Sequence, residues 1–371
     1  MIEKAKEYRF NLCLGFIDYE KAFDSLDHQS LLQALEDQIT DKKYIRLVKA
    51  IYKDPSARIH LEGDKTNIFK IMKGVRQGDP ISPKLFTAAL EDVFHNLDWQ
   101  SKGIAVDGEH LTHLRFADDI LLLSHQPQEL QTMMQELDRE SRKAGLNMNI
   151  KKTKVMMGDR TQEHKITVQG IDIETVDSYI YLGKRISLKN DTPGEVNRRI
   201  QLAWVKFGKL DFLFRDQDLP ISLKKQVFNQ CIIPVLSYGA ETWTTTRKLE
   251  KKLRVTERAM ERIMIGVTRK DRVTNQNLRE KTNVQDIIKE IKIKKWRWAG
   301  HLARQHDNRW TARISNWTPR TCVRRRGRPS RRWTDELREF AGVTWQRRAQ
   351  DRLKWKIDEE AFLLQWSEVG C

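Results

Sequence analysis

The sequence predicts an α+β protein in which a mixed part of helices and strands comes first and an all-helical part follows. Up to residue 187, short apolar runs suited to buried strands alternate with stretches whose apolar residues recur every three or four positions. From Thr192 onward only the helical spacing continues. Between the two parts, "LKNDTPGE" is rich in turn-forming residues. We therefore expect domains at residues 1–189, 190–283 and 284–371.

The mixed part begins with a strand over residues 11–18 that ends in Asp18. The spacing of leucine and other apolar residues predicts helices near 29–37 and 41–52. A hairpin turning at Gly63–Asp64 should follow. Pro83 suits the first turn of a helix that runs to about Trp99.

The rest of the mixed part contains one long helix and several short strands. The Asp-Gly pair at 107–108 predicts a hairpin turn. A helix is expected over 126–144, ended by Gly145 in the left-handed cap position. The short strands are expected near 153–157, 165–169, 171–175 and 179–187.

The helical part begins with an amphipathic stretch over residues 192–266. One broad face of its first helix is basic and another is apolar; the basic residues are Arg198, Arg199, Lys206 and Lys209, and the apolar ones are Ile200, Ala203, Trp204 and Phe207. Such a basic face suits the phosphates of an A-form duplex. A plain amphipathic helix with a solvated basic face explains the pattern equally well.

Composition places the chain among globular proteins. It has 371 residues, of which 39% are hydrophobic and 32% charged. It has no apolar run of about eighteen residues and no signal-like apolar core at its start, so we expect no membrane span and no secretion. The four cysteines lie far apart without a CxxC pair, which favours an intracellular setting, in the nucleus or cytoplasm.

The net charge of +17 is concentrated near the C-terminus. Residues 291–371 contain 20 Lys and Arg against 9 Asp and Glu, together with 8 of the 11 tryptophans. Positive charge interleaved with aromatic rings suggests contact with a phosphate backbone. A generic basic protein is the alternative.

"LRFADDILLLS", residues 114–124, sets two adjacent acids between apolar runs. Carboxylates in an apolar layer are costly unless something compensates them, and two neighbouring ones repel each other. Asp118 and Asp119 are therefore placed well to hold a divalent cation, which prefers carboxylate oxygens.

A third acid occurs in a matching context, since Asp18 follows the apolar run 12–17. An Asp at one strand end and an Asp pair on a neighbouring hairpin could converge on two magnesium ions, the arrangement suited to nucleotidyl transfer. The alternative is that these acids cap turns.

Five segments in this order resemble the palm of a reverse transcriptase, specifically that of non-LTR (LINE-type) retrotransposons. They are "GFIDYEKAFDSLDH", "KGVRQGDPISPKLF", "RFADDILLLS", "AGLNMNIKKTKVMM" and "YIYLGKRIS". Together they extend over residues 11–187. The resemblance implies a polymerase palm, meaning an antiparallel sheet with packed helices, followed by a helical thumb.

The resemblance also implies a role for each matching residue. Asp18, Asp118 and Asp119 would bind two Mg²⁺ ions, with Mn²⁺ as a substitute, and Lys152 would neutralise or protonate the pyrophosphate. Phe23 would lie under the sugar and clash with a 2′-hydroxyl. Contact with the nucleotide and template would come from Gln77 and Gly78, and the primer grip would comprise Tyr181, Leu182 and Gly183.

The C-terminal region, 284–371, resembles that of the RTE-like group of these elements. Its basic run should contact nucleic acid through Arg324, Arg325, Arg326, Arg328, Arg331 and Arg332. Several tryptophans of the region either stack on unpaired bases or pack a small helical core; they are Trp296, Trp298, Trp310, Trp317 and Trp333.

The resemblance thus implies an RNA-directed DNA polymerase, a nucleotidyltransferase of a transposable element. Its partners would be an RNA template, a DNA primer or target, and deoxynucleoside triphosphates. A non-catalytic RNA- or DNA-binding remnant of a retroelement is the alternative. An RNA-dependent RNA polymerase is a third reading, disfavoured by Phe23 and by Ala117 before the acid pair. Nothing in the sequence indicates the oligomeric state.

The resemblance begins almost at Met1. In the family, a fingers segment that grips the triphosphate precedes the first of these motifs, and an endonuclease precedes the fingers. We therefore expect a truncated copy with little or no processive synthesis, because positioning charges contribute strongly to phosphoryl transfer.

Overall fold

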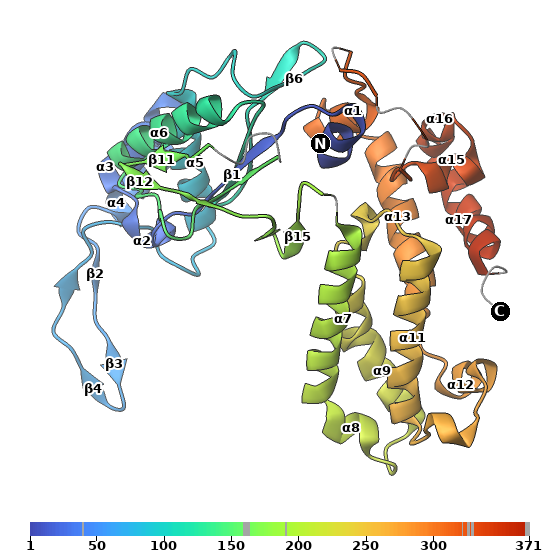
Figure 1. The fold of residues 1–371 in the computed structure, drawn as a ribbon. Helices are drawn as coiled ribbons and strands as arrows, with labels where there is room; N and C mark the ends of the chain where they lie inside the picture. The colour runs from blue at the N-terminus through green and yellow to red at the C-terminus, as the bar shows by residue number, and fades with distance from the viewer. Residues whose placement is uncertain are drawn as a thin grey trace. The chain divides into compact units, whose positions relative to one another are not determined.

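The computed structural model describes residues 1–38, 41–158, 164–189, 191–320, 322–324, 327 and 330–367 (Figure 1). The chain divides into two compact units. The sheet unit comprises Tyr8–Tyr179, and the helical unit comprises Ile180–Cys371 together with Glu3–Glu7. Each unit encloses an apolar core of its own.

The sheet unit is built on five strands in the order β13–β10–β1–β9–β8. They span Glu174–Thr175, Lys154–Met157, Cys13–Ile17, Asp119–Ser124 and His113–Phe116. Neighbours are antiparallel except β10 and β13, which run parallel. All five residues of β1 are buried, as its central position requires, and this explains why its sequence is apolar without alternation.

Helices pack on this sheet and on one another. Helix α6 (Pro127–Lys143) packs on β1 and β9, and α5 (Ser82–His95) packs on α6. Gly15 lets α6 approach closely, because a Cβ there would lie 3.2 Å from Leu130 Cδ1. The remaining helices of this unit are α2 (Ala22–Ser25), α3 (His28–Asp37) and α4 (Lys42–Ile51).

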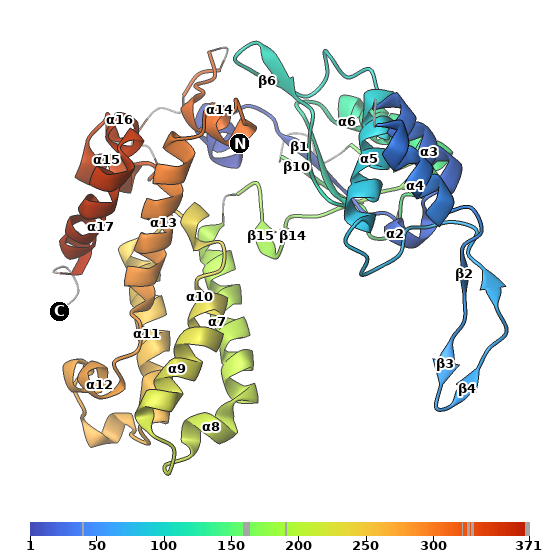
Figure 2. The same cartoon turned by 180° about the vertical axis from the view of Figure 1, so that it is seen from behind.

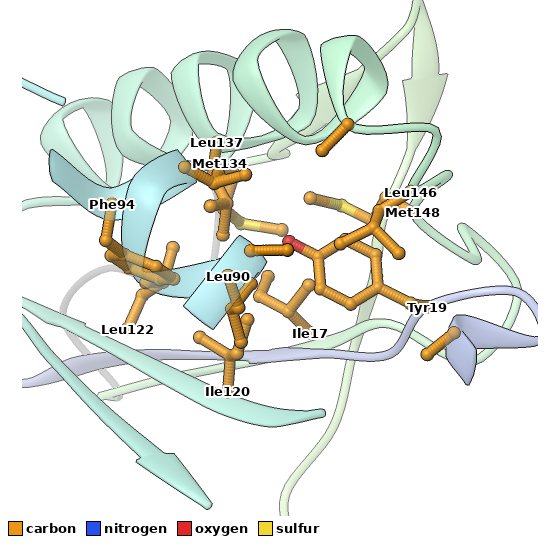
Figure 3. Close-up of a cluster of buried hydrophobic side chains, with 14 of the residues drawn as sticks. Ile17, Tyr19, Leu90, Phe94, Ile120, Leu122, Met134, Leu137, Leu146 and Met148 are labelled. Atoms are coloured by element: carbon orange, nitrogen blue, oxygen red, sulfur yellow. The ribbon is translucent and has the colours of Figure 1, made fainter. Parts of the chain in front are cut away.

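The core of the sheet unit lies between the sheet and these helices (Figure 3). Ile17 and Ile120 of the sheet belong to one buried cluster with Leu90 of α5 and with Met134 and Leu137 of α6. The strand ends that carry the acids, at Ile17 of β1 and Ile120 of β9, are therefore packed against a continuous apolar layer.

Short two-stranded hairpins complete the unit: β2 (Ser56–Ala57) with β5 (Phe69–Lys70), β3 (His60–Leu61) with β4 (Asp64–Lys65), β6 (Ile104–Val106) with β7 (Glu109–Leu111), and β11 (Thr167–Val168) with β12 (Ile171–Asp172). The Asp107–Gly108 turn is confirmed, with both residues at positive φ.

Two predicted boundaries in the sheet unit were wrong. The tip of the β3–β4 hairpin is Glu62–Gly63, one residue before the predicted turn, because Leu61 pairs with Asp64. Helix α5 ends at His95 instead of near Trp99. Trp99 turns into the core, where its indole N–H donates to Glu136 Oε2 at 2.7 Å.

The helical unit contains most of α1 (Ile2–Tyr8), most of the hairpin of β14 (Tyr179–Tyr181) and β15 (Lys184–Ile186), and a helix bundle (Figure 2). Its α-helices are α7 (Thr192–Lys209), α8 (Asp211–Arg215), α9 (Ile221–Cys231), α10 (Ile233–Leu236), α11 (Arg247–Met264), α12 (Asn275–Thr282), α13 (Ile287–Ala303), α14 (Trp310–Asn316), α15 (Asp335–Ala341), α16 (Trp345–Gln350) and α17 (Arg352–Ser367). Short 3₁₀ turns occur at Ala240–Thr242 and Arg269–Asp271.

The unit boundaries differ from the expected domains in two places. The expected boundary after residue 189 lies later than the observed one, because the tip of the β14–β15 hairpin is bonded to Arg199 of α7 and to Tyr238, two residues after α10. The region expected to start at 284 is continuous with the bundle. Helix α13 contributes Ile291 to the bundle core and Trp296 to the core of the C-terminal helices.

Buried ion pairs join the C-terminal helices to the bundle. Lys292 and Lys295 of α13 are each 1% exposed, and both Nζ atoms lie 3.1 Å from Glu336 Oε2 of α15. Lys292 also pairs with Glu250 of α11 at 2.8 Å. Removing one partner from such a cluster would leave an uncompensated buried charge.

The prediction of a solvent-facing basic surface on α7 is wrong for two of its four residues, Arg198 and Arg199. Arg199 is only 6% exposed and its Nε donates to Glu195 Oε1 at 2.7 Å. Arg198 pairs with the same carboxylate at 2.9 Å, and both arginines donate to the carbonyl of Gly183. These two side chains hold the hairpin in place, and Lys206 and Lys209 remain exposed.

The C-terminal tryptophans mainly pack the helical unit. Trp296 is fully buried and stacks on Trp355 with centroids 3.7 Å apart, and Trp317 is 8% exposed. Trp333 donates its indole N–H to the Glu241 carbonyl at 2.7 Å. Trp298 and Trp310 are half-buried. The packing alternative therefore fits most of this set.

In the described part of the chain, no helix combines the length and the apolar character that crossing a membrane requires.

Candidate active site

The acid pair lies at a tight turn between β8 and β9. Phe116 pairs with Asp119 across the turn, which leaves Ala117 and Asp118 at its tip, and Ala117 takes a left-handed φ of 54°. The following residues, Ile120 to Leu123, are at most 6% exposed because β9 lies between β1 and β8. The apolar run thus buries the strand and holds the two acids at its exposed end.

Strand register brings Asp18 to the same edge. β1 and β9 are antiparallel, and their last pair is Ile17 with Ile120. Asp18 follows Ile17 and Asp119 precedes Ile120, so the antiparallel register sets the two aspartates opposite each other. This is the convergence that the matching strand-end contexts predict.

The carboxylates influence each other electrostatically. The pKa of Asp119 is raised first by burial and then by the charges of Asp118 and Asp18. Burial also raises the pKa of Asp18, and Asp118 adds to this, whereas Lys152 opposes it. The site therefore carries more negative charge than its protein surroundings compensate.

One carboxylate oxygen of this site is unsatisfied. Asp18 Oδ2 is buried and accepts no hydrogen bond from the described residues. Lys152 Nζ lies 3.7 Å from it on a side chain that is 69% exposed. An orphaned buried acceptor is costly, and a cation would relieve it. The donor chemistry therefore fits a divalent ion, although within the described ranges no three His, Cys, Asp or Glu side chains already stand as a metal-holding group.

The loop that carries Lys152 is bonded to the backbone of Asp18. The Asn149 N–H donates to the Asp18 carbonyl at 2.7 Å, and the Asp18 N–H donates to Thr153 Oγ1 at 3.3 Å. These bonds place the lysine beside the acid. Sequence reasoning selected Lys152 but missed Thr153, because a hydroxyl that orients a backbone leaves no recognisable sequence pattern.

A tyrosine that sequence reasoning missed also lies near the acids. The Tyr179 ring stacks on Phe16 with centroids 4.3 Å apart. Its pKa is raised by burial and then by the charges of Asp18 and Asp119. The alternation of Tyr179 and Tyr181 along one strand was the available signal, since it sets both rings on one face.

A second group of predicted residues gathers around α2. Phe23 is half-buried and stacks on Phe86, with centroids 4.8 Å apart. The Val75 N–H donates to the Phe23 carbonyl at 2.6 Å, and Gln77 Nε2 donates to Asp24 Oδ1 at 3.0 Å. The structure thus brings the segments around Phe23 and Gln77 together.

Glycines allow this close approach. Gly74 has a φ of 92°, and a Cβ there would lie 2.7 Å from the Asp24 carbonyl oxygen. Gly78 has a φ of 84° and open space around it. Gln77 and Asp24 line a hollow, here called the Gln77 hollow, whose walls include the cations Arg58, Lys73 and Arg76.

The predicted primer-grip residues form the tip of the β14–β15 hairpin in the helical unit. Leu182 and Gly183 make the turn with φ values of 48° and 73°. Tyr238 Oη donates to the Leu182 carbonyl at 2.9 Å. The tip is therefore fixed to the bundle, while Tyr179 at the start of the hairpin belongs to the sheet unit.

The basic run of the C-terminal region is partly committed to ion pairs. Arg324 and Arg332 pair with Glu7 of α1 at 2.8 and 2.6 Å, and Arg331 pairs with Glu339 at 2.9 Å. Arg325, Arg326 and Arg328 lie outside the described residues. The described arginines thus tie α1 to the C-terminal helices.

Another basic surface, which sequence reasoning did not single out, lies along α11. A hollow, here called the α11 groove, is lined by cations at intervals of three or four residues: Arg247, Lys251, Arg254, Arg258 and Arg262. Arg258 pairs with Glu261 at 2.5 Å. Among the described residues of this lining, Glu250 is the one acid; it is 9% exposed and pairs with Lys292.

Comparison with known families identifies a clear match that covers the sheet unit, α1 and the β14–β15 hairpin. The family described as "Reverse transcriptase (RNA-dependent DNA polymerase)" matches residues 2–186. This range holds the first four motifs, all of the fifth except Ser187, and the predicted catalytic residues.

Curated relatives are proteins of mobile elements. A transposon-derived protein of Caenorhabditis elegans is 33% identical over 267 residues, which cover 67% of this chain and 95% of that protein. A polyprotein of the R2 retrotransposable element of Nasonia vitripennis is 29% identical over 170 residues, covering 46% of this chain and 16% of the polyprotein. The RNA-directed DNA polymerase of the Drosophila melanogaster element jockey is 23% identical over 336 residues, covering 86% of this chain and 36% of that protein.

The chain therefore spans nearly all of the nematode protein but a minor part of the R2 and jockey proteins. Among solved structures, apo telomerase from Candida tropicalis aligns with 10% identity and a TM-score of 0.43, covering 79% of this chain and 48% of that one.

Proposed function

The chain belongs to the reverse transcriptase (RNA-dependent DNA polymerase) family of non-LTR retrotransposons, and we propose that it extends a primer 3′-hydroxyl with deoxynucleotides on an RNA template. The observation that carries the proposal is the convergence of Asp18, Asp118 and Asp119 at one sheet edge, with an unsatisfied buried oxygen on Asp18.

Those three carboxylates are the residues that would hold two Mg²⁺ ions or, in their place, Mn²⁺. When bound, such ions activate the attacking hydroxyl and stabilise the departing pyrophosphate. Asp18 and Asp119 lie at the ends of paired strands, and the three side chains would draw together around the ions, because within the described residues they do not already form a metal-holding group. Asp118 lies beside Asp119 at the tip of the turn and is half-buried.

Lys152 has the position and freedom to act on the leaving group. Its backbone is fixed next to Asp18, whereas its side chain is 69% exposed. We propose that its ammonium group neutralises or protonates the pyrophosphate. A lysine that stayed locked to Asp18 could not do so, and the 3.7 Å separation is long for a charge-assisted hydrogen bond.

Phe23 would exclude the ribose 2′-hydroxyl, since its ring is held against Phe86 and cannot swing away cheaply. Gln77 and Gly78 would contact the incoming nucleotide and the template. The cations of the Gln77 hollow offer positive charge for their phosphates. Arg58, Lys73 and Arg76, which supply this charge, all lie after the first motif, GFIDYEKAFDSLDH, in the sequence.

The helical unit would hold the template–primer through the α11 groove and the hairpin tip. Cations at three- and four-residue intervals rise about 4.5–6 Å each along a helix, which suits a row of phosphates. Tyr181, Leu182 and Gly183 would grip the primer strand. A non-catalytic nucleic-acid-binding protein is the second candidate, because the α11 groove needs none of the three aspartates.

Primer extension tests the proposal. The full chain is incubated with a DNA primer annealed to an RNA template, deoxynucleotides, and Mg²⁺ or Mn²⁺. Wild type and Asp64→Asn, which changes an exposed acid of β4, should extend the primer, whereas Asp118→Asn should not. Absence of template-dependent extension by wild type in both metals, with binding intact, would leave only the second candidate.

A further inference from the structure

The helical unit contains a hollow beside the tip of the β14–β15 hairpin, here called the hairpin hollow. The hairpin forms one wall through Leu182 and Lys184. Tyr238, directly after α10, forms a second wall, and Trp298 of α13 forms a third. All of these residues belong to one compact unit, so the hollow does not depend on how the two units are placed.

Its walls are mainly apolar and aromatic. Trp298 lies two residues from the fully buried Trp296, so it faces away from the core that Trp296 and Trp355 share, and it is half-buried. Tyr238 is 47% exposed, and its ring is held by the hydrogen bond to Leu182 and by the Arg199 guanidinium 4.3 Å from the ring centroid. Held, partly exposed rings offer a stacking surface at little cost in conformational entropy.

Cations surround this aromatic surface. Lys294 Nζ is oriented by Ser237, donating to its Oγ at 2.6 Å and its carbonyl at 3.2 Å. Arg297 is 68% exposed, although it forms a two-bond pair with Glu359. Lys184 donates to Thr242 Oγ1. Of the described lining residues, Glu241 alone is an acid, so the hollow favours an anionic ligand.

Aromatic faces with adjacent cations are the combination that binds unpaired nucleotides, since the base stacks and the phosphate is neutralised. A duplex presents its phosphates and hides the faces of its bases, so it cannot use the aromatic surface. A generic acidic peptide would use the cations and leave the apolar walls unfilled. The chemistry of the hollow therefore selects single-stranded nucleic acid.

We propose that the hairpin hollow binds one unpaired nucleotide of a single-stranded segment, with the base on Trp298 and its phosphate near Lys294. This inference rests on the proposed function for its biological setting, because a polymerase that copies a strand must also hold unpaired stretches of it. It gives α13, which follows the expected thumb, a direct part in binding.

The test compares single-stranded and duplex oligonucleotides by fluorescence anisotropy with the full chain. Trp298→Ala should weaken binding of a labelled oligo-dU or oligo-rU about five- to hundredfold. Binding of a blunt RNA–DNA duplex should stay within about twofold of wild type. Trp298→Phe should restore most of the single-strand affinity, and Trp204→Ala, a 36%-exposed tryptophan on α7, should leave it unchanged.

Lys294→Gln should lower the salt dependence of single-strand binding by about 0.7 in the slope of log affinity against log salt. Equal loss of single-strand and duplex binding in Trp298→Ala would overturn the proposal, as would unchanged single-strand binding. Binding by Trp298→Ala is interpreted only if this variant has the same melting temperature as Trp298→Phe. If it melts lower, the proposal is judged on single-strand binding by Trp298→Phe and on the salt dependence of Lys294→Gln.

Failure of this inference is distinguishable from failure of the proposed function. Asp18→Asn should bind single strands as wild type does while losing primer extension. Extension by wild type together with normal single-strand binding by Trp298→Ala would overturn only the hairpin hollow. Trp298-dependent binding without extension would overturn only the polymerase proposal.

Discussion

Neutralising Asp18 should stabilise the metal-free protein while abolishing its activity. Asp18 Oδ2 is buried without a hydrogen bond, and its pKa is raised by burial and by Asp118 even after the opposing effect of Lys152. An unsatisfied buried group costs about 1–3 kcal/mol. Asparagine keeps a polar atom at this position but removes the buried charge and its repulsion by Asp118. Because the side chain is 32% exposed and Lys152 already offsets part of that charge, about 1 kcal/mol should be recovered in Asp18→Asn.

For a unit of this size, about 1 kcal/mol raises the melting temperature by about 2–4 °C. The assay is thermal unfolding in EDTA at pH 7 and again with excess Mg²⁺. Wild type should gain stability from Mg²⁺ by mass action, and Asp18→Asn should gain much less. Asp64→Asn serves as the matched control and should behave as wild type.

The pH dependence of this difference has a defined sign. A raised pKa means that the folded state keeps the Asp18 proton more readily than the unfolded chain does. The cost of the charge is therefore present above the folded pKa and disappears in acid, where wild type and Asp18→Asn should have equal stability. A lower melting temperature for the variant in EDTA would contradict the cost assigned to the Asp18 charge, and an undiminished response to Mg²⁺ would contradict its role as a metal ligand.

Four further predictions concern other parts of the chain. Glu336→Gln should destabilise the helical unit by about 3 kcal/mol in urea unfolding, because it leaves Lys295 buried against a neutral amide. Burial raises the pKa of Glu257 to about 8 from 4.5, so near neutral pH the folded unit holds a proton that the unfolded chain releases. The free energy of unfolding should therefore fall as the pH rises from about 5 to 8, and Glu257→Gln should remove this pH dependence. Phe23→Ala should lower the preference for deoxynucleotides over ribonucleotides by about 10- to 100-fold in single-nucleotide incorporation. Arg254→Glu should weaken duplex binding uniformly across sequences and reduce the salt slope by about one or two.

The site could largely be predicted from the sequence because it is encoded by strand ends. One apolar run long enough for a buried strand ends just before Asp18 and another begins just after Asp119, and an antiparallel sheet with short turns brings such ends together. The left-handed positions at Asp107–Gly108 and Gly145 are equally local, since they are dictated by backbone sterics. Local chemistry of this kind is readable from one sequence.

Pairings between distant charges were beyond prediction. Arg198 and Arg199 sit on a helical face that reads as solvated, but the structure uses them to hold the carbonyl of Gly183. Lys292 and Lys295 also look like surface residues, and both are buried on Glu336. Which acid meets which base depends on tertiary packing, and a helical periodicity does not carry that information.

These pairings also affect how deletions are interpreted. Removing residues 320–333 would delete Arg324 and Arg332, which pair with Glu7, together with Trp333, whose backbone N–H donates to Glu3 Oε2 at 2.9 Å. Loss of nucleic-acid binding after such a deletion would therefore report detachment of α1 as well as loss of charge. Single substitutions in the α11 groove or the hairpin hollow avoid this ambiguity.

The most direct test of the account is the single-turnover rate of adding one deoxynucleotide to a DNA primer on an RNA template. It should be measured at saturating protein and Mg²⁺ for wild type, Asp18→Asn, Asp118→Asn and Asp64→Asn. The account predicts that wild type and Asp64→Asn react at similar rates, whereas the other two fall by at least about a thousandfold with unchanged template–primer binding. Rates for Asp18→Asn and Asp118→Asn within a few-fold of wild type would contradict it.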